Sequence, residues 1–195
     1  MKKWSLNFRL WHWIHTTVIL GLLGTVFLRK TFLSWRTNSE ILSTKLSSID
    51  ISVTTDQAKM LAKSIRAPMW EWHIILGYAL AALVVWRIAL FFTESGKQNY
   101  RHLKEETLHK KMVKIGYIVI YSILLFMTMS GFTIYFYETL GLTKDFAHNI
   151  KELHELAYIA IYIFVPLHIL GVFIAENQDE KGILSDMVNG GTHHH

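Results

Sequence analysis

Four long apolar segments alternate with charged segments along the chain. They run from about Trp11 to Leu28, Trp72 to Phe92, Ile115 to Phe136 and Leu156 to Ile174. Each spans roughly 18–22 residues, close to the ~20 that a helix needs to cross the ~30 Å hydrocarbon core of a bilayer. Because only helices of this length satisfy their own backbone hydrogen bonds in lipid, the pattern predicts an all-α membrane protein, a four-transmembrane-helix bundle.

The first connection, about residues 29–69, is long for a link between two membrane helices. Residues 56–67 have the apolar spacing of a surface helix, with Thr54 or Thr55 as its N-cap. Pro68 is expected to end this helix. We therefore predict an extended outer connection with an amphipathic helix on the membrane surface, either a structured linker or a partner-binding element.

The amino-acid composition limits the kinds of cofactor that the chain can bind. The chain is 51% hydrophobic and 18% charged, and it contains no cysteine. The missing thiols exclude disulfide scaffolds, iron–sulfur clusters and covalently attached c-type haem. The length allows one domain, which we place at residues 1–189; residues 190–195 end in three histidines and resemble a purification-tag remnant.

Basic residues set the predicted orientation. They flank the N-terminus and fill the connection between the second and third apolar segments: Lys2, Lys3, Arg9, Lys97, Arg101, Lys104, Lys110, Lys111 and Lys114. With four crossings these two regions share one side, so both termini are expected in the cytoplasm. The 29–69 connection also holds several basic residues, which opposes this orientation, but they are diluted over a long segment. Because the basic residues flank apolar segments, the net charge of +5 does not indicate nucleic-acid binding.

Histidines in the apolar segments form a pattern. His154 and His168 are 14 residues apart on the fourth helix. At ~100° per residue they face the same side, and the helix rise separates them by roughly 21 Å, one near each membrane surface. His12 begins the first helix on the inner side, level with His168, and His73 begins the second on the outer side, level with His154.

Two histidine pairs stacked across the membrane suit two haem b groups, each held between two imidazoles. His15, one turn after His12, is the rival ligand on the first helix. His109 is either a ligand, a quinone contact or a solvated loop residue. Each histidine taken alone could instead be a packing or interfacial residue.

Further residues fit the same interpretation. Arg9 and Arg87 are placed to meet the propionates of the inner haem, although each could simply extend to lipid headgroups. Small residues on the helices would let a porphyrin approach closely. These are Gly21, Gly24, Gly77 and Gly171.

These residues resemble those of the bacterial cytochrome b561 family and the related cytochrome b subunits of nickel–iron hydrogenases. The resemblance rests on these motifs: Arg9-Leu10-Trp11-His12-Trp13, His73-Ile74-Ile75-Leu76-Gly77, Arg87, the run from Gly116 to Tyr121, and His154-Glu155-Leu156-Ala157 followed by His168. It implies the same ligand pairs, and a location in the bacterial inner membrane. The 29–69 connection is longer than in the short members of the family.

Three functions are compatible with the sequence. The first is transmembrane electron transfer through two haems b between quinone and a donor or partner subunit on the outer face. The second is a superoxide:quinone oxidoreductase acting alone, with Lys63 and Arg66 attracting the anion. The third is a haem-free transporter of protons or metal ions that uses the histidines as a relay.

Overall fold

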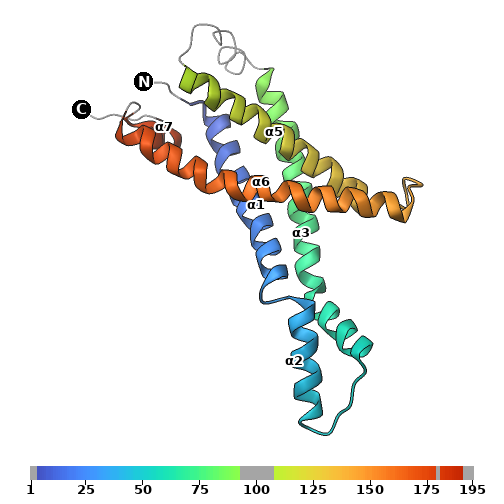
Figure 1. The fold of residues 1–195 in the computed structure, drawn as a ribbon. Helices are drawn as coiled ribbons and strands as arrows, with labels where there is room; N and C mark the ends of the chain where they lie inside the picture. Colours follow the sequence, from blue (N-terminus) through green and yellow to red (C-terminus); the bar gives the residue numbers. More distant parts are fainter. Residues whose placement is uncertain (1–3, 93–107, 179–180, 191–195) are drawn as a thin grey trace. The chain divides into compact units, whose positions relative to one another are not determined.

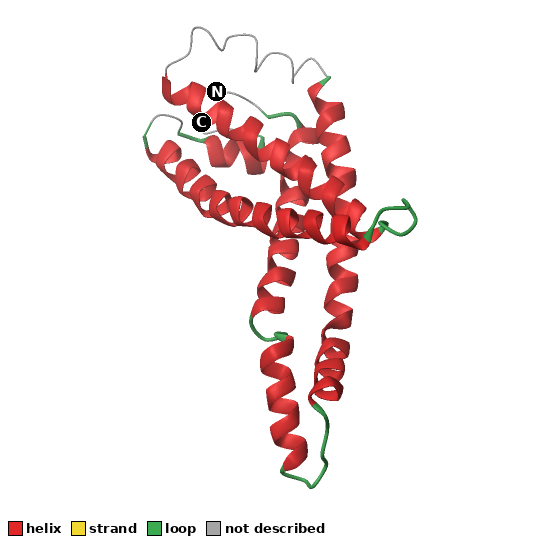
Figure 2. Ribbon diagram, turned by 45° about the vertical axis from the view of Figure 1, so that its right-hand side comes forward, coloured by secondary structure: helices red, strands yellow, loops and turns green. Residues whose placement is uncertain are grey.

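The computed structural model describes residues 4–92, 108–178 and 181–190, apart from the side chains of residues 108–110. Its helices are α1 (Leu6–Lys30), α2 (Trp35–Ser47), α3 (Thr55–Phe91), α5 (Leu108–Tyr135), α6 (Lys144–Asn177) and α7 (Ile183–Asn189) (Figure 1). These described residues contain no β-strand (Figure 2).

Four of these helices are long and apolar enough to cross a membrane. They are α1, α3, residues Lys111–Tyr135 of α5, and α6. Their apolar side chains are largely exposed: Leu156 is 64% exposed and Phe173 68%. Such exposure is costly in water but natural in lipid. The predicted four-span helical architecture is therefore confirmed.

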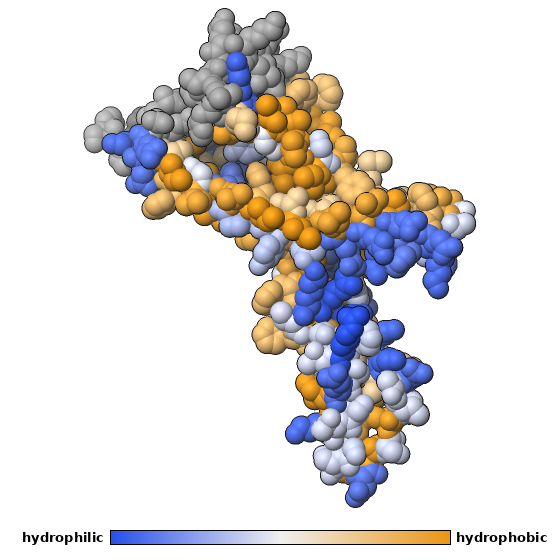
Figure 3. All heavy atoms as spheres, in the orientation of Figure 1, coloured by the Kyte–Doolittle hydropathy of each residue, from blue (hydrophilic) through white to orange (hydrophobic). Residues whose placement is uncertain are grey.

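The chain divides into two compact units. The larger unit comprises Met1–His15 and Leu80–His195, and the smaller unit comprises Thr16–Ala79. Apolar side chains cover most of the visible surface of α5 and of the second half of α6, whereas the first half of α6 also carries a polar surface (Figure 3). In the smaller unit, polar side chains dominate around α2 (Figure 3).

The smaller unit contains a helix that the sequence analysis missed. α2 lies within the 29–69 connection, where only one helix was expected. Its first residue, Trp35, lies under two cations: Arg36 Cζ is 4.9 Å and Lys63 Nζ 5.8 Å from the ring centroid. Lys63, a candidate for attracting superoxide, thus packs against an aromatic ring.

The start of α3 agrees with the predicted capping. Gln57 N donates to Thr54 Oγ1 at 3.2 Å, and Thr54 N donates to Gln57 Oε1 at 2.8 Å. This reciprocal pair is a capping box. Of the two candidate caps, Thr54 is the residue used.

The end predicted for this helix is wrong. Pro68 lies inside α3, which continues without interruption into the second membrane span. A proline removes a single backbone hydrogen bond and bends a helix, and a long apolar continuation outweighs that loss. Figure 1 shows α3 changing direction between its first turns and the remainder. The amphipathic segment is therefore the first part of the spanning helix and not a separate surface helix.

In the larger unit, α6 packs against both α5 and α7. α7 follows α6 closely because Glu176 caps it: Gly182 N donates to Oε1 and Leu184 N to Oε2, both at 2.9 Å. A carboxylate at a helix N-terminus is favoured by the exposed N–H groups and the helix dipole. α7 was not predicted from the sequence.

Candidate functional site

Two of the predicted ligands meet in the larger unit. The ring centroids of His12, on α1, and His168, on α6, are 6.3 Å apart with an interplanar angle of 53°. A bond between an imidazole nitrogen and a first-row metal measures about 2 Å, so two imidazoles on opposite sides of one metal ion have centroids roughly 6 Å apart. The spacing of these rings therefore fits a pair of axial ligands.

Aromatic rings surround His168. Phe164, one turn earlier on α6, stacks on it with centroids 5.5 Å apart and planes at 13°. Tyr117 of α5 meets it edge-on at 6.2 Å. These contacts restrict the orientation of the imidazole and shield one side of the ring from water.

The rival ligand, His15, has different neighbours. Its ring stacks on Trp11 with centroids 4.7 Å apart, and its Nε2 is buried without a hydrogen-bond partner among the described residues. A buried nitrogen of this kind could also ligate a metal. Of the two α1 histidines, however, His12 is the one whose ring lies beside His168.

Trp11 fixes the start of α1 against the end of α3. It is only 3% exposed, and its Nε1 donates to the Leu83 carbonyl at 2.8 Å. A buried indole N–H needs such a partner. The bond places the His12 turn of α1 and the last turns of α3 in a defined register within the larger unit.

Arg87, from those last turns, points into an aromatic cage. Its Cζ lies 4.9 Å from the Tyr121 centroid, 5.5 Å from that of Phe8 and 5.6 Å from that of Trp11. Its Nε is buried without a hydrogen-bond partner in the described part of the chain. A guanidinium over three rings is held by cation–π attraction while its edge can still donate hydrogen bonds to an anion.

Arg9 lies against the end of α7. Gly190, with φ +77°, approaches it so closely that a Cβ there would collide with Arg9 Nη1. A second contact joins α1 to α7: Trp13 Nε1 donates to the Met187 carbonyl at 3.2 Å. A cation near a helix C-terminus is electrostatically favourable. Arg9 thus has a structural contact in addition to its predicted role toward a propionate.

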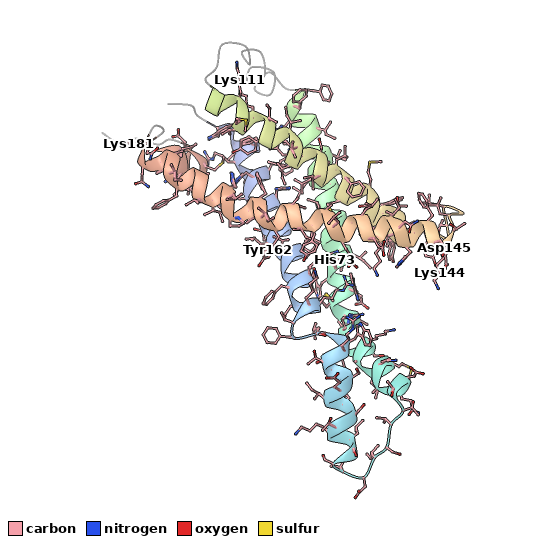
Figure 4. The ribbon with its side chains drawn as sticks, in the orientation of Figure 1. His73, Lys111, Lys144, Asp145, Tyr162 and Lys181 are labelled. Carbon is pink, nitrogen blue, oxygen red and sulfur yellow. The ribbon has the colours of Figure 1, made fainter. Side chains whose placement is uncertain are left out.

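His73 lies on α3 in the smaller unit (Figure 4). Its Nδ1 is 2.7 Å from Thr25 Oγ1 of α1, and the Trp70 ring meets it edge-on with centroids 5.4 Å apart. Arg29 lies over the Trp70 ring, with its Cζ 5.2 Å from the ring centroid. The imidazole is thus held by one hydroxyl and one indole.

His154 has a matching environment on α6 in the larger unit. Its Nδ1 is 2.8 Å from Ser130 Oγ of α5. A Cβ built on Gly131 would lie 3.5 Å from His154 Cε1, an ordinary contact distance. Since α6 is one continuous helix, the predicted common face of His154 and His168 is compatible with its geometry.

The remaining candidates are less informative. His148 Nε2 pairs with Glu152 Oε1 at 3.3 Å on an exposed part of α6. His102 and the side chain of His109 lie outside the described residues. Within the described ranges, no three His, Asp or Glu side chains gather as a metal-binding group, which leaves no ordinary three-ligand zinc site there.

Glycines along the helices leave open space. A Cβ on Gly24, Gly77 or Gly171 would meet nothing within 4 Å, whereas one on Gly21 would lie 3.0 Å from Leu76 Cδ1. A Cβ at Gly21 would therefore need the end of the Leu76 side chain to shift slightly, whereas the other three positions have room for one.

The family model described as prokaryotic cytochrome b561 matches residues 3–190, nearly the whole chain. No curated protein and no solved structure matches the chain.

Proposed function

The chain belongs to the prokaryotic cytochrome b561 family, and on that premise we propose that it carries electrons across the membrane through two haem b groups. The family and the four apolar helices make it a bacterial transmembrane cytochrome b. The finer proposal is transfer between membrane quinone and a donor or partner subunit on the outer face, with both termini in the cytoplasm.

One observation carries this proposal: the meeting of His12 and His168. They are far apart in sequence, yet their rings lie 6.3 Å apart in one unit. We assign them as the residues that would hold the inner haem. Phe164 and Tyr117 hold the His168 ring and keep water from it, which favours a stable, low-dielectric ligand environment.

We assign His73 and His154 to the outer haem. Each has its Nδ1 beside a buried hydroxyl, and Nε2 would be the nitrogen that binds iron. Gly77 follows His73 by one turn, and its open surroundings would accept the face of a flat group.

Haem b supplies an iron centre that accepts and releases one electron at a time. The residues of the chain do the rest. The four histidines would hold the two haems, and Arg87 and Arg9 would supply positive charge for the propionates of the inner haem. This arrangement allows electron flow in either direction.

A pyridine haemochrome assay tests the cofactor. Protein produced with haem available should contain about two haems b per chain and show the split visible bands of a low-spin cytochrome. A colourless protein would overturn the proposal and favour the haem-free transporter.

A vesicle assay tests the reaction. Ferricyanide is trapped inside proteoliposomes and a short-chain quinol is added outside. The reconstituted cytochrome should reduce the ferricyanide faster than empty vesicles and faster than vesicles with the His168→Ala variant. Equal rates in all three would reject quinone-linked electron transfer.

A further inference from the structure

Two buried hydroxyls contact histidines in the same way, once in each unit. Thr25 is 7% exposed and Ser130 3% exposed, among the few buried polar residues of the described chain. Thr25 Oγ1 lies 2.7 Å from His73 Nδ1, and Ser130 Oγ lies 2.8 Å from His154 Nδ1.

Each hydroxyl also contacts a backbone carbonyl of its own helix. Thr25 Oγ1 is 2.6 Å from the Leu22 oxygen, and Ser130 Oγ is 2.7 Å from the Phe126 oxygen. A carbonyl oxygen has no proton to donate, so each hydroxyl must be the donor in its contact with the carbonyl. A hydroxyl has only one proton to give.

The proton count fixes the histidine tautomer. Because the hydroxyl proton goes to the carbonyl, the hydroxyl accepts from the imidazole, and Nδ1 carries a proton in both histidines. In the neutral ring Nε2 then holds the lone pair, which is the form that ligates a metal. Hydrogen bonding of the opposite nitrogen also orients a ligating ring and increases its basicity.

We propose that Thr25 and Ser130 are positioning residues that hold His73 and His154 in the iron-binding tautomer and strengthen them as ligands. This inference rests on the proposed function, since it takes these histidines as haem ligands. If His73 and His154 hold the same haem, as proposed above, each hydroxyl would act on it through the histidine that it contacts.

The alternative is that each hydroxyl serves only to donate a hydrogen bond to a backbone carbonyl of its own helix, as serine and threonine commonly do in membrane helices. The chain contains residues that do this on exposed positions. Ser122 Oγ donates to the Ile118 carbonyl at 2.9 Å and Thr31 Oγ1 to the Phe27 carbonyl at 2.8 Å. Ser122 lies on α5, as Ser130 does, and Thr31 directly follows α1, so they are matched controls.

The test is a redox titration of the purified holoprotein, followed by optical and electron paramagnetic resonance spectra. The variants are Thr25→Val and Ser130→Ala, with Thr31→Val and Ser122→Ala as controls. Loss of the Nδ1 bond weakens the imidazole as a donor and so destabilises ferric iron. Substitutions beside metal ligands change affinity by about 10–100-fold; a tenfold change in the ferric–ferrous equilibrium is about 59 mV for a one-electron couple.

We expect both variants to raise the midpoint potential of the same haem by about that amount, with a changed resonance spectrum and the other haem unaltered. Thr25→Ser and Ser130→Thr keep the hydroxyl and should restore both readouts. If Thr25→Val or Ser130→Ala loses a haem, retention of that haem at its normal potential in the hydroxyl-keeping variant still supports the inference.

Suppose that the wild-type protein holds two haems, but Thr25→Val and Ser130→Ala change the potentials and spectra no more than the control substitutions do. That result would overturn this inference alone. Loss of a haem in the hydroxyl-keeping variants as well would also overturn it, because side-chain shape would then be the cause. Wild-type protein without haem would overturn the proposed function itself.

Discussion

The two ends of α6 present histidines in contrasting ways. His154 lies in the polar half of the helix, where its Nδ1 meets the Ser130 hydroxyl and where Lys151 pairs with Glu155 at 3.6 Å. His168 lies in the apolar half, between Phe164 and Tyr117 and beside His12. One ring is held by a directional hydrogen bond and the other by aromatic packing.

If α6 holds two haems as proposed, this difference would give the two haems separate properties. A hydrogen bond to Nδ1 changes the electron donation of the imidazole, whereas stacking mainly fixes the ring plane and removes water. We therefore expect two distinct midpoint potentials, tuned by different kinds of neighbour. The predictions below test that contrast, beginning with the ligands themselves.

The largest effect is expected from removing the two α6 histidines one at a time. His154→Ala and His168→Ala should each lower the haem content from about two per chain to about one, because one axial ligand cannot hold a haem as firmly as two. The measurement is the pyridine haemochrome per chain, with redox titration to identify the haem that remains. The two variants should retain different haems.

His148→Ala is the matched control, since His148 lies on the same helix and is exposed beside Glu152. It should keep both haems. Equal haem loss in His148→Ala, or full haem content in His168→Ala, would contradict the assignment of the α6 ligands.

The next prediction concerns the partner of His168 on α1. His12→Ala should lose the same haem as His168→Ala, because its ring is the one beside His168. His15→Ala should keep both haems and lose only the stacking on Trp11, which is worth roughly 0.5–1.5 kcal/mol. The haem content and the midpoint potential of the remaining haem distinguish the two variants. Loss of that haem in His15→Ala but not in His12→Ala would make His15 the ligand.

A smaller effect is expected from Arg87. Arg87→Leu removes the cation from its aromatic cage and should lower the free energy of unfolding by roughly 1–2 kcal/mol. It should also lower the midpoint potential of the haem assigned to His12 and His168, because nearby positive charge favours the reduced form. Arg87→Lys should recover part of the potential but little of the stacking.

Arg36→Leu serves as the control for Arg87. Arg36 lies over the ring of its neighbour Trp35 in the smaller unit and is exposed. Detergent unfolding and redox titration should show little change in this variant. An Arg87→Leu protein indistinguishable from Arg36→Leu in both measurements would remove Arg87 from the haem environment.

Much of the fold could be predicted from the sequence, because a bilayer leaves few choices. Apolar length alone identified the four spans that the structure contains. The predictions that failed concern the end of one helix and two short helices outside the four apolar segments. The rule that proline ends a helix failed at Pro68, because the apolar residues beyond it continue as helix. α2 has 13 residues and α7 has 7, so neither is long enough to be identified by apolar length, and α2 contains no buried residue.

The candidate site could be predicted only as residue types at matched depths. Helical periodicity could place His12 and His168 at one level, but it could not show which α1 histidine faces α6. That choice depends on Trp11, whose bond to the Leu83 carbonyl sets the register of α1. Thr25 and Ser130 were not singled out, because a hydroxyl in a membrane helix usually bonds to its own backbone. Their contact with histidine is a tertiary feature.

The smallest predicted effects compare the immediate neighbours of the two α6 rings. Phe164→Leu removes the stacking on His168 and should cost roughly 1 kcal/mol of unfolding free energy. It should also broaden the resonance signal of one haem, because the ring plane is less restricted. Gly131→Ala adds a methyl group 3.5 Å from His154 Cε1, which is an ordinary contact, and alanine favours the helix by about 1 kcal/mol. Its spectrum should therefore be unchanged, because the Ser130 bond and not the space at Gly131 orients His154. Broadening in Gly131→Ala but not in Phe164→Leu would reverse the contrast between the two ends of α6.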